Sequence, residues 1–316
     1  MTGRGVLLTA YGSPATLDDV GSYFTHIRGG RAPSAEQVEE LRERYRRIGG
    51  TSPLRAVTAA QADGLRRELA RRGMALPVYV GMKHASPFIA DAVAAMARDG
   101  VREGVVLALA PHYSRMSIAS YFSTAAEAAS AHGIRLRAIE SWHDHPGFIA
   151  ALAARVRDAL ARFADPSAVE VIFTAHSLPE RILTWNDPYP AQLRVTAELA
   201  ARAASAGTWR FAYQSASHTG EKWLGPDLLE ALREIARSGR RDLVVCPIGF
   251  VADHLEVLFD IEVEAKETAS ELGLRLERAP SLNDGPDFIA ALADIVASAA
   301  QTAAEPRAGA RAEGRS

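Results

Sequence analysis

The sequence contains one cysteine, Cys246, among 316 residues. One cysteine cannot form a disulfide within the chain, and it cannot supply the set of thiolates that an iron–sulfur cluster or a structural zinc site requires. We therefore expect no iron–sulfur cluster, and any metal chemistry must use histidine, carboxylate or tyrosine side chains.

The sequence also lacks long apolar runs and a strong charge of either sign. Its apolar runs fall short of the roughly 20 residues that span a bilayer, and its start has no signal-peptide pattern. Its formal net charge is -2, so no overall basic field would attract nucleic acid. These absences predict a cytoplasmic protein without a membrane span or a nucleic-acid partner.

Short apolar runs rich in Val, Ile, Leu and Ala alternate with longer helical patterns. This alternation is typical of parallel strands joined by helices, so the predicted fold class is α/β. Many of the runs end in a polar or aromatic residue, at the edge of the sheet where such folds bind ligands. The predicted strands are residues 5–10, 77–82, 104–109, 136–140, 169–175, 209–214 and 242–246.

The chain contains an internal repeat. VLLTAYGSP from Val6 matches VIFTAHSLP from Val171, YVGMKH resembles YQSASH, and SWHDHPGFIAALA matches SLNDGPDFIAALA. The repeat predicts two similar α/β halves, residues 1–150 and 151–300, which face each other across a cleft. Tyr11 and His176 then take equivalent positions after the first strand of each half. Residues 301–316 have no apolar period and are predicted to be a disordered tail.

Three carboxylates follow the last predicted strand at a spacing of four residues. On an α-helix, Glu256, Asp260 and Glu264 would lie along one face and could form a metal track. In the alternative interpretation, Asp253 is the N-cap of this helix, Glu256 completes a capping box, and the rest is a solvated acidic face.

His176 stands where an apolar strand ends, shortly before Pro179. An isolated histidine at such a place is commonly a hydrogen-bonded structural group. Because His176 and the acidic helix each follow a strand of the same half, both can reach one crevice. An imidazole, a carboxylate and the Tyr11 phenolate from across the cleft are all acceptable ligands for ferrous iron.

Arginines are concentrated between residues 28 and 55, with Tyr45 and Ser52 among them. Guanidinium groups bind carboxylates through paired hydrogen bonds, so this patch would suit a substrate with several carboxylates. We expect Arg28 and Arg44 to point inward. The alternative is an exposed helix whose i,i+4 pairs, Glu40 with Arg44 and Glu43 with Arg47, are surface salt bridges.

Other candidates follow strands or precede helices. Lys83, His84 and Tyr121 are candidates for lining the pocket. His143 and His145 flank Asp144 like a metal cluster, but the repeat keeps the Asp-x-Pro pattern at residues 284–286 without either histidine. The repeated pattern therefore indicates a turn at the start of a helix.

Taken together, the motifs TAYGSP, HIRGG, RYRRIGGTSPL, TAHSLP, NDPYPAQL, YQSASHTGEKWLGP and GFVADHLEVLFD resemble those of ferrochelatases. The resemblance runs from Leu7 to the helix at Phe288. It implies two Rossmann-like domains with a porphyrin cleft between them, and a lyase that inserts ferrous iron, its substrate, in heme biosynthesis. It implies no nucleotide, and it makes His176 and Glu256 the catalytic, iron-binding pair.

Tyr11 is similar to the tyrosine of the branch that acts on coproporphyrin III, where it supplies an axial ligand to the iron product. The resemblance also makes Asp260 and Glu264 an iron relay, and it includes transient contact with the next enzyme of the heme pathway. One departure is Gly29, which stands where a second arginine often follows the first; another is Asn186, which replaces a usual glycine. The substrate-carboxylate contacts implied by the match are Arg28, Arg44, Tyr45, Ser52 and Tyr121.

Two classes of alternative stay open. The enzyme could act on protoporphyrin IX, or insert another metal into another tetrapyrrole, since histidine and glutamate alone do not define the metal. A protein of two α/β lobes could also hold a tetrapyrrole or a metal without catalysing a reaction.

Overall fold

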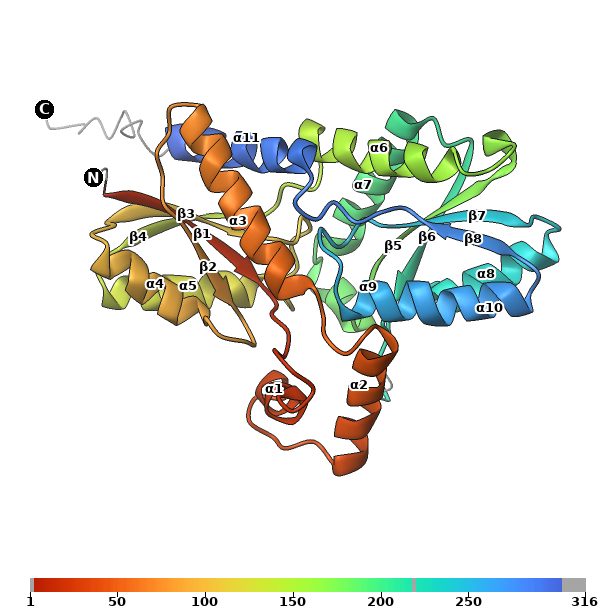
Figure 1. Ribbon diagram of the computed structural model, residues 1–316, viewed down its shortest axis with the longest axis horizontal. Helices are drawn as coiled ribbons and strands as arrows, with labels where there is room; N and C mark the ends of the chain where they lie inside the picture. Colours follow the sequence, from red (N-terminus) through yellow and green to blue (C-terminus); the bar gives the residue numbers. More distant parts are fainter. Residues whose placement is uncertain (1–2, 218–219, 303–316) are drawn as a thin grey trace, which may run out of the picture.

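A computed structural model describes residues 3–217 and 220–302 of the chain. Two four-stranded parallel sheets lie side by side, each covered by helices on both faces (Figure 1). The predicted α/β class and all seven predicted strands are confirmed.

The N-terminal sheet has the strand order β2-β1-β3-β4. Val6 and Leu8 of β1 face one core and Leu7 faces another, as the alternation of side chains along a strand requires. Its strands are β1 (Arg4–Ala10), β2 (Val78–Met82), β3 (Glu103–Ala108) and β4 (Arg135–Ile139). The helices up to its last strand are α1 (Val20–Ile27), α2 (Ala35–Arg47), α3 (Leu54–Arg71), α4 (Ile89–Arg98) and α5 (Ala119–Ala131).

The C-terminal sheet has the order β6-β5-β7-β8, which repeats the N-terminal order strand for strand and so confirms the internal repeat. Its strands are β5 (Glu170–His176), β6 (Thr208–Gln214), β7 (Asp242–Pro247) and β8 (Arg275–Arg278). Its helical elements are η1 (Pro166–Ala168), η2 (Glu180–Trp185), α7 (Tyr189–Ala204), α8 (Leu228–Arg237), α9 (Leu255–Phe259), the π-helical turn η3 (Asp260–Ala265) and α10 (Lys266–Glu271).

The last helix of each half packs on the other half. Helix α6 (Pro146–Leu160) contacts α7 and β7 of the C-terminal half, whereas α11 (Pro286–Thr302) contacts α3 and β3 of the N-terminal half. The two helices also contact each other, and Figure 1 shows them end to end above both sheets. Each begins at a proline after the repeated Asp-x-Pro turn, which confirms that turn as a helix start.

The exchanged helices lie in a core that both sheets share. Phe148 of α6 and Phe288 of α11 are fully buried and both pack against Trp142, with ring centroids 5.0 and 6.0 Å from the Trp142 ring. Val6 of the first sheet and Val171 of the second belong to the same cluster. The two halves therefore form one hydrophobic unit, which fixes the strand ends of both sheets relative to each other.

The α1–α2 segment, residues 20–47, lies below the two sheets and between them in the view of Figure 1. Ser34 and Gln37 form a capping box at the start of α2, and at its end Gly49 and Gly50 adopt φ values near +100° that favour glycine. The i,i+4 pairs of the alternative interpretation of α2 are absent among the described contacts. Glu43 binds Arg46 instead, and Arg47 reaches Glu267 of α10 in the other half.

Helix α11 continues to Thr302, two residues into the segment predicted to be disordered. The rest of that predicted tail lies outside the described residues. Over the part of the chain that is described, no helix is long and apolar enough to cross a membrane.

Candidate active site

Tyr11 and His176 lie at the carboxyl ends of the central strands β1 and β5, as the repeat predicts. The Tyr11 side chain is 41% exposed, which is unusual for a large aromatic group at the end of a buried strand. Beyond the end of the sheet, the backbone N–H groups of Lys83 and His84 donate to the carbonyls of Ala10 and Tyr11, both at 2.9 Å. The backbone that presents the phenol is therefore fixed.

His176 and Glu256 are brought together. Nε2 of His176 lies 3.6 Å from Oε1 of Glu256, and the two side chains keep 30% and 36% of their surface exposed. Burial alone would lower the pKa of His176 and raise that of Glu256. Their opposite charges outweigh burial, so the pKa of His176 rises to about 9 and that of Glu256 falls well below its usual range. The pair is ionised at neutral pH and remains accessible.

Both members of this pair have further partners. Nδ1 of His176 is hydrogen-bonded to the Ser177 carbonyl, and the Tyr189 hydroxyl donates to the His176 carbonyl at 2.9 Å. His254, which sequence analysis overlooked, places Nε2 3.4 Å from the second oxygen of Glu256. The spacing of His254, two residues before Glu256 in the same motif, is the signal that could have found it. Each oxygen of Glu256 thus faces a different imidazole.

The acidic segment differs from the predicted regular helix. Helix α9 begins at Leu255, and Asp253 is not its N-cap; the Asp253 carboxylate accepts hydrogen bonds from Arg278, Ser281 and Asn283 instead. The capping-box interpretation is therefore wrong. The helix widens into the π-helical turn Asp260–Ala265, a geometry that is frequent at functional sites.

Asp260 is 6% exposed, and the charges of both other carboxylates of this segment, Glu256 and Glu264, act on it. Burial is the main reason that its pKa rises to about 6, and the charges of Glu256 and Glu264 raise it further, while the Ser215 hydroxyl opposes the rise. Gln214 donates to Asp260 at 3.3 Å and to the Glu256 carbonyl at 3.0 Å. Gln214 ends strand β6 and Ser215 follows it, and sequence analysis gave neither a role.

The tyrosines of the N-terminal half surround the same space. Tyr45 and Tyr121 are 2% and 6% exposed. Burial is the largest cause of the raised pKa of Tyr11, Tyr45 and Tyr121, and the Glu256 carboxylate raises all three further. The Glu256 carboxylate of the C-terminal half is therefore close enough to the three phenols of the N-terminal half for its charge to act on them.

The residues predicted to bind carboxylates have contacts of their own in the structure. The Arg28 guanidinium donates to Gln37 at 2.7 Å and lies over Phe24, whereas Arg44 lies 5.1 Å from the ring centroid of Phe259. Arg44 therefore connects α2 with the segment that follows Glu256. The Ser52 side chain is 8% exposed, and its hydroxyl accepts a hydrogen bond from the Leu54 backbone at 3.3 Å.

His84 packs against Tyr11, with ring centroids 4.6 Å apart, and its Nδ1 lies 3.0 Å from Nδ1 of His26. Burial, with the charges of Lys83 and His26, lowers the pKa of His84 to about 4. His84 is therefore neutral beside the phenol at neutral pH.

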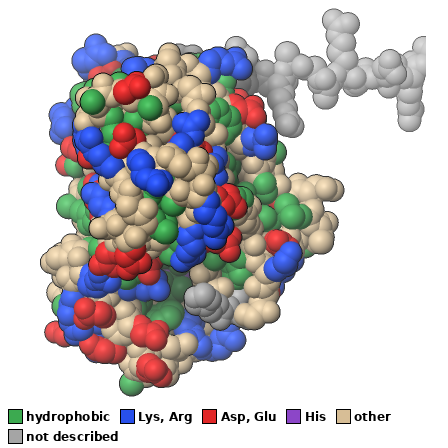
Figure 2. All heavy atoms as spheres, turned by 90° about the vertical axis from the view of Figure 1, so that its right-hand side faces the viewer, with side chains coloured by type: hydrophobic (Ala, Val, Ile, Leu, Met, Phe, Trp, Pro, Cys, Tyr) green, Lys and Arg blue, Asp and Glu red, His purple; other side chains and the backbone are tan. Residues whose placement is uncertain are grey.

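Figure 2, which looks at the C-terminal half, shows the surface hollowed between the α1–α2 segment at the bottom and the body of the molecule above it. Charged side chains of both signs stand on the rim, and apolar side chains line the interior. Within residues 3–217 and 220–302, no group of three His, Cys, Asp or Glu side chains converges to hold a metal ion. The protein side of the described site thus offers a pair of ligands and not a cage.

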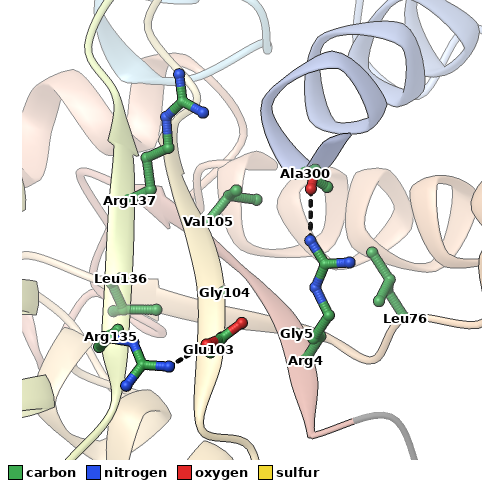
Figure 3. A pocket seen from close by; sticks show the side chains of 10 residues that line it. All are labelled: Arg4, Gly5, Leu76, Glu103, Gly104, Val105, Arg135, Leu136, Arg137 and Ala300. Carbon is green, nitrogen blue, oxygen red and sulfur yellow. Dashed lines mark hydrogen bonds and ion pairs between the residues drawn. The ribbon is translucent and has the colours of Figure 1, made fainter. Parts of the chain in front are cut away.

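A separate cavity lies at the opposite edge of the N-terminal sheet (Figure 3). The guanidinium groups of Arg4 and Arg137 donate to the carbonyls of Ala300 and Ala299 in the last turn of α11. Carbonyls in the last turn of a helix generally lack a partner within the helix, so these arginines cap α11. This cavity is explained by the docking of α11 and is not part of the cleft.

The family model for ferrochelatases matches residues 3–300. A ferrochelatase from Herpetosiphon aurantiacus is 46% identical over 296 residues, which cover 92% of this chain and 97% of that protein. A coproporphyrin III ferrochelatase from Halalkalibacterium halodurans is 43% identical over 296 residues, covering 92% and 96%.

Solved structures show the same fold at low sequence identity. The structure of SirB from Bacillus subtilis with Fe3+ matches with a TM-score of 0.62 at 12% identity, covering 95% of this chain and 96% of that one. The structure of CbiX, described as the terminal enzyme for biosynthesis of siroheme in denitrifying bacteria, gives 0.55 at 15% identity, covering 94% and 99%.

Two matched parallel sheets, with ionisable side chains from both at the strand ends, define an α/β protein of the chelatase type. The chain belongs to the ferrochelatase family. It is accordingly an enzyme, a lyase of heme biosynthesis that inserts ferrous iron, its substrate, into a porphyrin.

Proposed function

We propose that this ferrochelatase acts on coproporphyrin III and produces iron coproporphyrin III, with Tyr11 as the axial ligand of the product iron. The observation that supports this proposal is an exposed phenol at the end of β1 whose pKa is raised by burial and by the charge of Glu256, the partner of His176. A relative that is 43% identical over nearly its whole length bears the name coproporphyrin III ferrochelatase, which supports the choice of branch.

Metalation requires two pyrrole N–H protons to leave as Fe2+ arrives, so the site must exchange positive charges. Before iron binds, His176 holds a proton at neutral pH because Glu256 raises its pKa to about 9. When Glu256 binds Fe2+, its charge no longer stabilises the imidazolium, and the Nε2 proton is released. The freed Nε2 first ligates the incoming Fe2+ beside Glu256, because Nδ1 is engaged with the Ser177 carbonyl. Once iron has passed to the porphyrin nitrogens, Nε2 accepts one pyrrole proton and the other leaves to solvent. Four porphyrin nitrogens supply the ligands that a two-residue site lacks.

The other residues have supporting roles in this proposal. Asp260 and Glu264 pass iron towards Glu256, and Asp260 is largely ionised at pH 7 because its pKa is about 6. Polar groups bind the porphyrin carboxylates and so fix the macrocycle in the cleft. The residues assigned to this role are Arg28, Arg44, Tyr45, Ser52 and Tyr121.

In this enzyme residues 1–150 form the domain that binds the porphyrin carboxylates, and residues 151–300 form the domain that binds iron. The enzyme acts in the cytoplasm and uses neither an iron–sulfur cluster nor a nucleotide. It makes transient contact with the next enzyme of the heme pathway. The lone buried thiol, whose pKa burial raises to about 12, is a poor metal ligand and supports the expectation of no cluster.

Anaerobic metalation with Fe2+ tests the proposal, with coproporphyrin III and protoporphyrin IX compared at equal concentrations. We expect a higher kcat/KM for coproporphyrin III. His176→Ala should lose nearly all metalation and keep porphyrin binding, whereas His132→Ala, at an exposed histidine after α5, should match the parent.

Each alternative has its own signature in this experiment. Faster metalation of protoporphyrin IX would reassign the substrate. Porphyrin binding without iron insertion above the spontaneous rate would favour a binding protein. Full activity of His176→Ala would remove that histidine from the mechanism.

A further inference from the structure

The chain has three lysines among its 36 basic residues, and Lys83 differs from the other two. Lys222 and Lys266 form ion pairs with Glu180 and Glu262. Lys83 forms none with any carboxylate of the described chain, although it is half-buried. Burial lowers the pKa of the Lys83 ammonium.

The position of Lys83 is fixed from two sides. Its backbone follows β2 and donates to Ala10, next to Tyr11, while Nζ lies 5.2 Å from the ring centroid of the buried Tyr121. Ala85, two residues after Lys83, packs closely against the backbone of Gly12. A Cβ on Gly12 would stand only 2.9 Å from the Cβ of Ala85, so the close approach requires glycine. The ammonium is thus held at the wall formed by β1, β2 and α5.

A half-buried ammonium loses part of its hydration, and without a carboxylate nearby this loss is not offset by the protein. The cation–π contact with Tyr121 replaces only part of it. The group is therefore suited to an anion that arrives from the cleft. A compact ammonium on a flexible stem also accepts a carboxylate in several positions, unlike a planar guanidinium.

The Lys83 ammonium is separate from the arginine group. Arg44 lies on α2 against Phe259 of the C-terminal half, whereas Lys83 lies against Tyr121 of the N-terminal half. A porphyrin can present carboxylates to both of these separate cations only if its carboxylates are distributed around its rim. Coproporphyrin III carries four propionates, and protoporphyrin IX carries two on adjacent pyrroles.

We infer that Lys83 binds a propionate of the porphyrin that lies away from the arginine group, and so selects a substrate with four carboxylates. This inference rests on the proposed function, since it assigns a role in the binding of the same substrate. Lys83 would be a specificity residue and would take no part in proton or iron transfer.

The test compares Lys83→Met, Lys83→Arg and the control Lys266→Met, whose ammonium pairs with Glu262 on α10. Porphyrin Kd is measured by fluorescence quenching without iron, and KM and kcat by anaerobic metalation. Loss of one charge-assisted bond should raise the Kd and KM of Lys83→Met for coproporphyrin III about tenfold, with kcat within about twofold. For protoporphyrin IX we expect less than about threefold. Lys83→Arg should recover most of the loss, and Lys266→Met should show none.

An unchanged coproporphyrin Kd in Lys83→Met, or equal losses with both porphyrins, would overturn the inference. So would a fall in kcat at constant Kd, because that would put Lys83 in the chemical step. A parent protein that fails to metalate coproporphyrin III would instead contradict the proposed function, so the two failures are distinguishable.

Discussion

The backbone of Gly249 lies directly against Ala175, the residue before His176 in β5. A methyl group on Gly249 would stand 2.6 Å from the Ala175 Cβ and 3.0 Å from its Cα. Both atoms belong to the central strand of a sheet and cannot move without moving His176. The glycine after β7 therefore sets the position of the catalytic candidate in the neighbouring strand.

Gly249→Ala should displace His176 and lower kcat of metalation by tenfold or more, because misplacement of a reacting group by about 1 Å can cost a factor of 100. Porphyrin Kd should change by less than twofold. Gly207→Ala is the matched control, since a Cβ there meets no atom within 4 Å. Parent-like kcat in Gly249→Ala would show that the strand end accommodates the extra methyl group.

Asp260→Asn should stabilise the iron-free protein at neutral pH and impair iron insertion. The folded protein raises the pKa of Asp260 from 3.8 to about 6, so this carboxyl contributes stability at low pH that is lost as the pH rises from about 4 through 6. Removing the charge should therefore raise the free energy of unfolding by up to about 3 kcal/mol at pH 8 and leave it nearly unchanged below pH 4. Urea unfolding at both pH values measures this difference, and equal effects at both would contradict the assigned cause.

Phe288→Ala should destabilise both halves together. Phe288 is fully buried in the core that the two sheets share, and truncation of such a side chain costs about 3 to 5 kcal/mol. Because the core is continuous, unfolding should remain a single transition when it is followed by circular dichroism and by tryptophan fluorescence. Leu183→Ala, at a side chain that is 51% exposed, should change stability by less than about 0.5 kcal/mol. Two separate transitions in the parent protein would argue against the shared core.

Asn186 tests a departure from the family pattern. Its φ of 49° lies in the left-handed region, which asparagine tolerates and glycine prefers, so the replacement preserves the turn. The turn holds Asp187, whose carboxylate accepts hydrogen bonds from Ser114 and Arg115 of the N-terminal half. Asn186→Gly should be nearly neutral, and Asn186→Val should lower the free energy of unfolding by about 1 to 2 kcal/mol. Equal stability of the two variants in urea would remove the conformational explanation.

The strands were predictable because seven of them are apolar runs between helical patterns. Strand β8 was missed because it is a four-residue edge strand with the sequence RLER, whose charged residues give no apolar run. Its partner in the repeat, β4, has more apolar residues and was found. Alignment of the repeat from β4 would have located β8, so the information was present in the sequence.

The contact between His176 and Glu256 could be predicted because His176 ends β5 and Glu256 follows β7, two neighbouring parallel strands whose carboxyl ends lie at the same edge of the sheet. The π-helical turn was not, since residue spacing alone cannot distinguish a wide turn from a regular one. The ion pair of Arg47 could not be predicted from the local sequence either, because its partner Glu267 is 220 residues away in the chain. Spacing within a helix could suggest only the nearer carboxylates.

The crossing of α11 onto the first sheet has a consequence for synthesis of the protein. The N-terminal half lacks its covering helix until residues 286–302 have left the ribosome, although its own strands are complete by Ile139. Helix α3 covers part of that face earlier. Nascent chains of this enzyme should therefore keep the rest of the face uncovered for more than half of translation, and gain native protease resistance only near termination.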